Sequence, residues 1–415
     1  MKLLTLLLLC SSLFAFANTQ ESAFALRDGD RVVFYGDSIT SDGGYARFVE
    51  AYTRSHYPQW NLRFYNAGVG GDKVSGGWAG NIGVRLERDV IRLKPTVVTI
   101  MLGMNDGGYK KFDPATLATY AEGYRALVAK LKEALPGVRL YFIRSTPFDD
   151  IARAPNFDPG YNEALRQLSD FVSAFGKEQQ VPVVDFGSSL ENGIRAVCQE
   201  NKELAKQVIS DRVHPGTAGH FLMGATLLRA WNAPALVARV AIDAKSKTVT
   251  AAENTVVSAL SVEGGKVTWT ELDRSLPLPV NFGENANTQL AHMAKADLES
   301  LSVEPLVITG LKSGRYELRI DDTSVGTFTD AELAKGVNLG VCDTPMLWQA
   351  LRVTWGTDGG HALHRIWREL MAASAENPDY ATAAKIIWAR DEAAQSTRSQ
   401  QALPKTRQYS VTPVP

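Results

Sequence analysis

Short apolar runs recur along the first half of the chain, between about residues 25 and 235. Several of these runs are continuous rather than alternating, as expected for parallel strands that are covered on both faces. We predict strands at Arg31–Tyr35, Leu62–Tyr65, Thr96–Leu102, Val138–Arg144 and Val181–Asp185.

Amphipathic helical patterns separate these runs. The clearest is Pro114–Leu135, which ends before Pro136-Gly137. The other predicted helices are Tyr45–Arg54, Gly83–Leu93, Tyr161–Gln179, Leu190–Ile209 and Ala218–Trp231. This strand–helix alternation predicts an α/β domain over residues 25–235, with an open parallel sheet that carries helices on both faces.

The pattern changes near Asn232-Ala233-Pro234, where short alternating stretches begin. They predict a smaller β-rich domain over residues 236–343. Two helical patterns, Leu347–Leu370 and Tyr380–Gln395, predict a trailing helical segment over residues 344–395. The polar tail from Ser396, which ends in Pro-Val-Pro, is expected to be mobile over residues 396–415.

The first 17 residues have the features of a signal peptide. Lys2 precedes the apolar stretch Leu3–Phe14, which is too short to span a bilayer, and Ala15-Phe16-Ala17 is a small-x-small cleavage site. We therefore expect a mature chain that begins at Asn18, is periplasmic or secreted, and has no integral membrane segment. A lipoprotein signal at Cys10 is less favoured, because Leu9 before it is bulky.

Composition mainly excludes some classes of function. A chain of 415 residues suggests two domains, and a net charge of −1 gives no bulk attraction to nucleic acid or to an anionic membrane. Cys198 and Cys342 could form one bridge, but two buried thiols are slightly favoured. No cysteine–histidine cluster has zinc spacing, and His361 and His364 lack a matching acidic or thiol partner. We expect no metal.

The residues with candidate chemistry follow predicted strands or lie in loops. Gly36-Asp37-Ser38-Ile39-Thr40 follows the first strand, and Asp211-Arg212-Val213-His214-Pro215 comes after the last. A serine hydroxyl needs an adjacent base to become a nucleophile, and His214 with Asp211 three residues earlier could supply it. The alternatives are a structural serine in a turn and a surface-loop histidine.

Two further segments could stabilise an oxyanion. The turn Gly68–Gly71 allows close backbone approach, so the N–H of Gly71 is a candidate, and Gly70 is the alternative one residue away. Asn105, after the third strand, offers a side-chain amide. A tight turn and an Asx-turn are the purely structural interpretations.

Together, these four segments resemble the signature blocks of the SGNH (GDSL-type) hydrolase family, in the family's order. The resemblance covers about residues 25–235. It implies a three-layer α/β/α sandwich with a five-stranded parallel sheet of the flavodoxin-like kind, and no metal or cofactor. It also implies Ser38 as nucleophile, Asp211 and His214 as its partners, and Ser38, Gly71 and Asn105 as the oxyanion hole.

The expected activity is serine ester hydrolysis through an acyl-enzyme. An exported member with an added β-rich domain suggests removal of acetyl groups from a polysaccharide. Alternatives are a lipid-type esterase (a lysophospholipase) or thioesterase, acyl transfer to a sugar, and an inactive glycan-binding protein. Trp78 and Tyr109 near the motifs, and Trp269, Trp348 and Trp355 in the second half, could stack on sugars, although core or loop packing is at least as good an explanation. The oligomeric state is not indicated.

Overall fold

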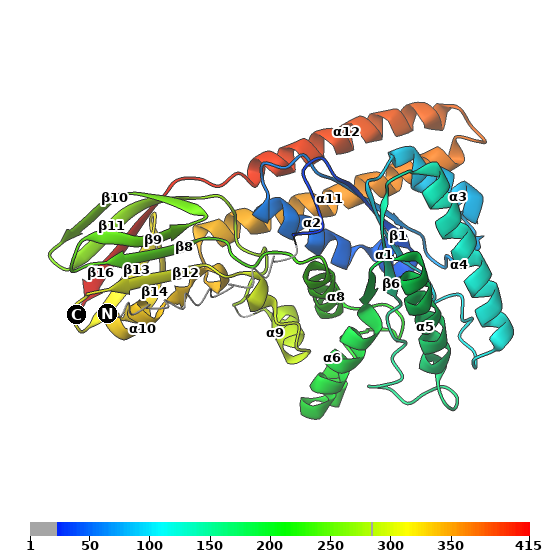
Figure 1. The fold of residues 1–415 in the computed structure, drawn as a ribbon, viewed down its shortest axis with the longest axis horizontal. Helices are drawn as coiled ribbons and strands as arrows, with labels where there is room; N and C mark the ends of the chain where they lie inside the picture. Colours follow the sequence, from blue (N-terminus) through cyan, green and yellow to red (C-terminus); the bar gives the residue numbers. More distant parts are fainter. Residues whose placement is uncertain (1–22, 284) are drawn as a thin grey trace, which may run out of the picture.

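The computed structural model describes residues 23–283 and 285–415. Figure 1 shows two lobes, an α/β lobe and a β-sheet lobe, with the long helix α11 running from the second lobe across the first. The sequence predicts this division near residue 235, because the pattern of apolar positions changes there.

A five-stranded parallel sheet forms the centre of the α/β lobe. Its strands are β1 (Arg31–Gly36), β2 (Arg63–Gly68), β5 (Val97–Met101), β6 (Arg139–Arg144) and β7 (Val183–Asp185), in the order β2-β1-β5-β6-β7. All neighbours are parallel, and Gly36 lies level with both Gly68 and Met101. This is the flavodoxin-like strand order, in which ligands bind beyond the carboxyl ends of the strands. The predicted α/β fold is confirmed.

Helices cover both faces of this sheet (Figure 1). One apolar core includes side chains from α2 (Gly44–His56), α6 (Phe186–Glu200) and α8 (Thr217–Ala230). The other includes side chains from α3 (Ile82–Asp89), α4 (Pro114–Ala134) and α5 (Tyr161–Gln179). Shorter elements are α1 (Ser38–Asp42), β3 (Gly76–Gly77), β4 (Gly80–Asn81), η1 (Ile91–Leu93) and α7 (Lys202–Ala205).

The helix predicted over Leu190–Ile209 is two helices. Asn201 ends α6 in an extended conformation, and its side chain accepts a hydrogen bond from the Leu204 N–H and so caps α7. Asparagine favours such a cap because its side chain competes for backbone hydrogen bonds.

Two sheets pack into a sandwich in the second lobe. One has the order β10-β11-β16-β13-β14 and the other β15-β12-β8-β9, and their apolar side chains share one core. The strands are β8 (Arg239–Asp243), β9 (Thr248–Glu253), β10 (Thr255–Glu263), β11 (Lys266–Asp273), β12 (Pro305–Thr309), β13 (Arg315–Ile320), β14 (Thr323–Thr329), β15 (Val337–Asn338) and β16 (Arg407–Val414). The helical elements of this lobe are α10 (Asp330–Lys335) and η3 (Leu339–Val341). Although they lie in the same stretch of sequence, α9 (Ala286–Met293) and η2 (Leu298–Leu301) pack on α8 and belong to the core of the α/β lobe.

The tail that the composition predicts to be mobile is the middle strand of the larger sheet. β16 pairs with β11 on one side and with β13 on the other, both antiparallel. Tyr409 and Val411 are buried in the sandwich core, and the intervening positions are polar. Period-two alternation therefore decides the structure of this segment, and its prolines do not prevent pairing.

The long helices α11 (Pro345–Ala373) and α12 (Asp379–Gln401) form a hairpin that packs on the α/β lobe rather than a separate segment. Glu50 of α2 bonds to Arg54, and its carboxylate also lies 2.9 Å from His361 Nε2 and 3.4 Å from Arg398 Nε. The contact with His361 of α11 and the ion pair with Arg398 of α12 join α2 to both helices of the hairpin.

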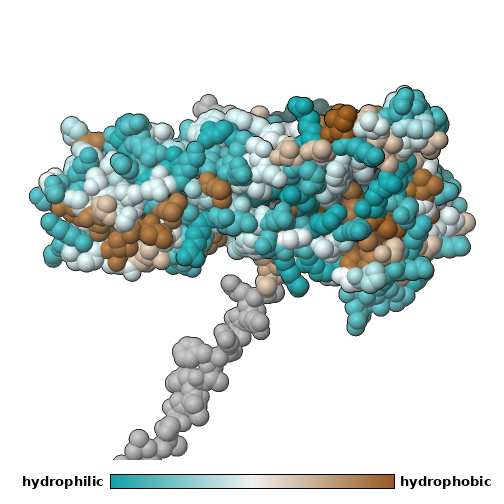
Figure 2. Space-filling model, turned by 90° about the horizontal axis from the view of Figure 1, so that it is seen from above, coloured by the Kyte–Doolittle hydropathy of each residue, from teal (hydrophilic) through white to brown (hydrophobic). Residues whose placement is uncertain are grey.

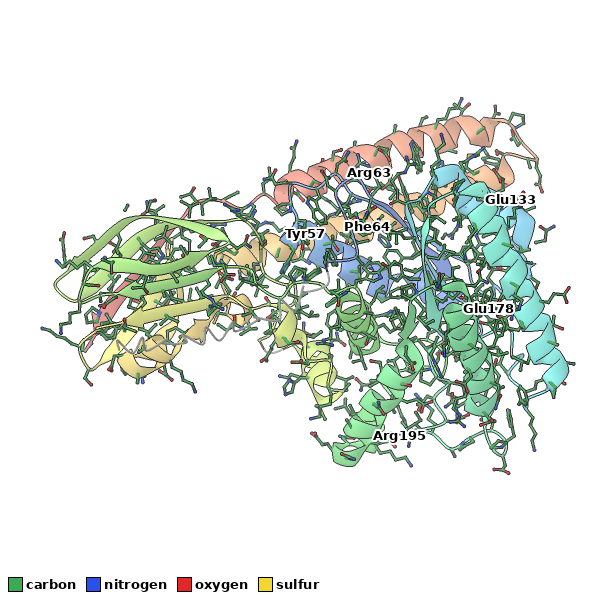
Figure 3. The ribbon with its side chains drawn as sticks, viewed as in Figure 1. Tyr57, Arg63, Phe64, Glu133, Glu178 and Arg195 are labelled. Atoms are coloured by element: carbon green, nitrogen blue, oxygen red, sulfur yellow. The ribbon has the colours of Figure 1, made fainter. Side chains whose placement is uncertain are left out.

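The same hairpin covers the free edge of the central sheet at β2. Figure 3 shows Arg63 and Phe64 of this strand beneath α12. Arg63 Nε lies 3.3 Å from Glu392 Oε2, and the Phe64 N–H donates to Gln395 Oε1 at 3.3 Å. An edge strand with unpaired backbone groups invites pairing with another chain, so this cover protects the sheet.

The visible surface is mostly polar. Figure 2 shows apolar side chains in separate patches on both lobes rather than in one continuous face. Within residues 23–283 and 285–415, no helix is long and apolar enough to cross a membrane. Cys198 and Cys342 are free thiols, as the sequence slightly favours, but both are half-buried rather than buried. The predicted signal sequence lies outside the described residues.

Candidate active site

Ser38 is the first residue of α1, directly beyond the carboxyl end of β1. Asp37 caps this helix by accepting a hydrogen bond from the Ile39 N–H at 3.0 Å. The N–H of the first helical residue has no partner within its helix, so the Ser38 N–H can serve a ligand. The backbone at position 36 passes close to Met101 of β5. Only glycine fits there, because a Cβ on Gly36 would lie 2.6 Å from the Met101 carbonyl oxygen.

His214 and Asp211 complete a continuous chain of hydrogen bonds with Ser38. His214 Nε2 lies 2.8 Å from Ser38 Oγ, and His214 Nδ1 lies 2.7 Å from Asp211 Oδ2. The other Asp211 oxygen accepts the backbone N–H groups of Val213 and His214 at 3.0 and 2.7 Å. The loop is therefore wound around the carboxylate, which fixes the direction of the imidazole. These are the contacts that a serine–histidine–carboxylate triad requires.

The candidate oxyanion donors lie at the ends of the neighbouring strands. Gly71 has φ +75°, which favours glycine, and a Cβ there would meet no atom within 4 Å, so its surroundings are open. Asn105 Nδ2 donates to the Asp72 carbonyl oxygen at 3.0 Å, and the Tyr109 hydroxyl donates to Asn105 Oδ1 at 2.9 Å. One amide hydrogen of Asn105 remains for a substrate oxygen.

A buried ion-pair network, which the sequence does not predict, supports this turn. Arg85 of α3 pairs with Asp72 at 2.9 Å and also with Asp89, and its Nη2 donates to the Ala67 carbonyl oxygen at 2.8 Å. All three charged side chains are fully buried. Asp72, directly after the glycines of the second motif, is the one visible signal in the sequence, because its arginine partner lies 13 residues away on a helix with no motif.

The pKa values of the carboxyl groups at the site are shifted in different directions. Burial raises the pKa of Asp37 to about 7 and that of Asp106 to about 6, against hydrogen bonds that lower both. For Asp211, burial acts in the same upward direction, but hydrogen bonds from the His214 backbone and ring outweigh it and hold the pKa below its ordinary value. The Asp211 carboxylate is therefore the one whose ionised form its surroundings favour.

The described residues offer no candidate metal site. Within the two described ranges, no group of three or more histidine, cysteine, aspartate or glutamate side chains could hold a metal ion. His361 contacts Glu50, and the ring of His364 lies between the rings of Tyr65 and Trp367.

The aromatic residues singled out in the sequence fall into two groups. Trp78 is 80% exposed, with its indole N–H donating to the Gly70 carbonyl oxygen at 2.8 Å, and Tyr109 is 42% exposed. Both therefore lie beside the glycine turn and Asn105 with exposed ring surface. In the second half, Trp269 is buried in the sandwich, and Trp348 and Trp355 are exposed on α11.

Residues 34–222 match the model of the GDSL-like Lipase/Acylhydrolase family. The α/β lobe belongs to this family, and the class of protein that the fold and the site define is a carboxylic ester hydrolase of the GDSL type. The family recognised from four short motifs is thus confirmed.

One sequence relative and two solved structures are similar to this chain. An acetylxylan esterase of Geobacillus stearothermophilus is 26% identical over 226 residues, which cover 48% of this chain and 93% of the esterase. A gut microbial diltiazem-metabolizing enzyme shares the fold over 95% of this chain and all of its own, with TM-score 0.82 and 22% identity. The structure of Axe2, an acetylxylan esterase of G. stearothermophilus, matches 50% of this chain and 96% of its own at 25% identity and TM-score 0.41.

Proposed function

We propose that this protein is an exported serine esterase that removes acetyl groups from a carbohydrate, with Ser38 as the nucleophile. The observation that carries the proposal is the hydrogen-bonded chain from Ser38 Oγ through His214 to Asp211, with separations of 2.8 and 2.7 Å. A hydroxyl so close to an imidazole nitrogen can lose its proton as it attacks a carbonyl.

The reaction has two halves. His214 Nε2 takes the Ser38 proton while Oγ bonds to the ester carbon, and the negative oxygen is held by the N–H groups of Ser38 and Gly71 and by Asn105 Nδ2. The C–O bond to the sugar then breaks, and His214 returns the proton to the departing alcohol. Water repeats the sequence on the acyl-enzyme, which releases acetate and restores Ser38.

The carbohydrate part of the proposal rests on two supports. The acetylxylan esterase relative is similar across nearly its whole length, and the exposed rings of Trp78 and Tyr109 beside the site could stack on pyranose faces. Export rests on the N-terminal sequence alone, and fractionation of cells that make the protein would test it.

The first test is hydrolysis of p-nitrophenyl acetate, butyrate and octanoate by the full chain and by Ser38→Ala. We expect acetate turnover that declines with acyl length and is lost in the variant, whereas Ser258→Ala on an exposed part of β10 retains it. Undiminished turnover by Ser38→Ala would remove this mechanism. Strong octanoate turnover would favour the lipid-type esterase, and a folded protein without activity would favour the glycan-binding alternative.

Acetylated xylo-oligosaccharides are the second substrate to test. Release of free acetate would support the proposal, and acetate found on an added acceptor sugar would instead indicate acyl transfer.

A further inference from the structure

A small cavity lies at the contact between the α/β lobe and the helical hairpin. Its volume is about 110 Å³, and it is lined by Ser41, Asp42, Arg47, Asn66, His361, Ala362, Arg365 and Arg368. The lining comes from the end of α1, from α2, from β2 and from α11, which the fold brings together across about 300 residues of sequence. This space is enough for a group of a few heavy atoms.

Two arginines of α11 line the cavity. Arg368 is buried, and its Nη1 donates to the Asn66 carbonyl oxygen at 3.1 Å. No described carboxylate side chain lies within ion-pair distance of Arg368 or of the exposed Arg365, the side chain of residue 358 being outside this description. Burial lowers the pKa of Arg368 to about 10, even though Asp89, already paired with Arg85, acts in the opposite direction. A buried charge of this kind is costly unless an anion accompanies it.

The one acidic residue of the lining is already engaged. Asp42 Oδ1 lies 3.1 Å from His220 Nε2 and 3.8 Å from Arg47 Nη2. Its hydrogen bond with His220 is the main reason that the pKa of Asp42 falls below the ordinary value. Among the described side chains of the lining, no further carboxylate is left to face Arg365 and Arg368.

One ring nitrogen of His361, Nδ1, is buried at the cavity without a hydrogen-bond partner among the described residues. The other ring nitrogen, Nε2, lies 2.9 Å from Glu50 Oε2, and although burial raises the pKa of Glu50, the charges of Arg54 and Arg398 hold it well below its usual range. An ionised carboxylate only accepts, so Nε2 donates to Glu50, and in the singly protonated form of an imidazole the other nitrogen, here Nδ1, is an acceptor. Nδ1 is buried without a partner in the described chain, 3.3 Å from where a Gly43 Cβ would lie.

We propose that this cavity binds inorganic hydrogen phosphate, whose oxygens accept from Arg365 and Arg368 and whose hydroxyl donates to His361 Nδ1. Hydrogen phosphate combines two negative charges with one O–H donor. Sulfate lacks that donor, and a phosphomonoester is mostly a dianion without one near neutral pH, because its second pKa is about 6. The bound anion would join α11 to β2 and α2, so it would also stabilise the docked hairpin.

Calorimetric titration of the full chain with inorganic phosphate, sulfate and glucose 1-phosphate near neutral pH tests this site. We expect phosphate to bind at least about tenfold more tightly than either competitor, since each lacks one buried hydrogen bond. Arg365→Gln, an exposed change that should not disturb folding, is expected to weaken phosphate binding by about tenfold or more. Arg195→Gln, an exposed arginine of α6 far from the cavity (Figure 3), should bind as the parent does.

Absence of phosphate binding would overturn the proposal, as would equal binding by the parent and Arg365→Gln. Equal affinity for sulfate and phosphate would overturn the role of the hydroxyl and of His361. Ester hydrolysis is not a readout in this experiment, so its outcome is independent of the proposed esterase function.

Discussion

Asn105 is held at both ends of its amide. The Tyr109 hydroxyl donates to Oδ1, and Nδ2 donates to the Asp72 carbonyl oxygen, so the amide cannot rotate without losing a hydrogen bond. In Tyr109→Phe the Oδ1 contact is lost, and we expect kcat for p-nitrophenyl acetate to fall about tenfold with little change in KM, because the loss acts on the transition state. Tyr380→Phe, at a similarly exposed tyrosine of α12, is the matched control. An unchanged kcat in Tyr109→Phe would contradict this positioning role.

Trp78 offers a different test at the scale of one residue, because it should contact the sugar and not the acetyl group. Its ring is exposed, and only its indole N–H is engaged, on the Gly70 carbonyl. We expect Trp78→Ala to raise KM for acetylated xylo-oligosaccharides about tenfold, in line with loss of one ring contact, and to leave p-nitrophenyl acetate hydrolysis nearly unchanged. Exposed Trp355→Ala is the control, and an equal loss on both substrates would argue against sugar stacking.

The sequence indicates the candidate site residues but not the groups that hold them. Ser38, Gly71, Asn105 and His214 each lie in a short motif at a strand end or in a loop, and parallel strands bring such ends to one edge. Arg85 lies on an ordinary amphipathic helix, and its pairing with Asp72 depends on how that helix packs. Local pattern carries no information about such a pairing.

At the scale of elements, β16 shows how composition can mislead. The alternation through Tyr409 and Val411 is a strand signal, but the polar residues before it and the two prolines favour a tail. The α11–α12 hairpin is predicted as helices, yet its docking on β2 and α2 is not, because it depends on partners such as Glu50 and His361, 311 residues apart. Contacts of that separation are set by tertiary packing.

Removal of residues 404–415 is expected to unfold the sandwich. The deletion takes away β16 and leaves β11 and β13 without their shared neighbour, and it removes the buried Tyr409 and Val411 from the core. Circular dichroism should show loss of strand signal, and limited proteolysis should cut within residues 236–343. Deletion of Pro415 alone is the control, and a truncated chain that resists proteolysis like the parent would refute the expectation.

For the whole molecule, three buried carboxyl groups in the sandwich make stability depend on pH. Burial raises the pKa of Glu271 from 4.5 to about 9, with Asp273 adding to the rise, and burial also raises the pKa values of Asp273 and Glu304. A carboxyl with a raised pKa in the folded state stabilises the fold fully below its unfolded pKa, and this contribution is lost as pH rises through the folded value.

We therefore expect the urea midpoint of unfolding to fall as pH rises from about 5 to about 9. Glu271→Gln should make this fall shallower, because an amide stays neutral, and the exposed Glu263→Gln should follow the parent. A parent midpoint that rises over this range, or a variant with the same slope, would show that Glu271 does not carry the effect.

The path of the chain between the lobes also bears on biosynthesis. The sandwich is begun by residues 239–338, the hairpin that covers the α/β lobe comes next, and the middle strand of the sandwich follows at Arg407–Val414. As the polypeptide leaves the ribosome, β11 and β13 therefore have to wait, with hydrogen-bonding edges open, until α11 and α12 have emerged. During that interval the nascent protein is exposed to mispairing with other chains, so a pause or a chaperone there would influence yield more than the final stability does.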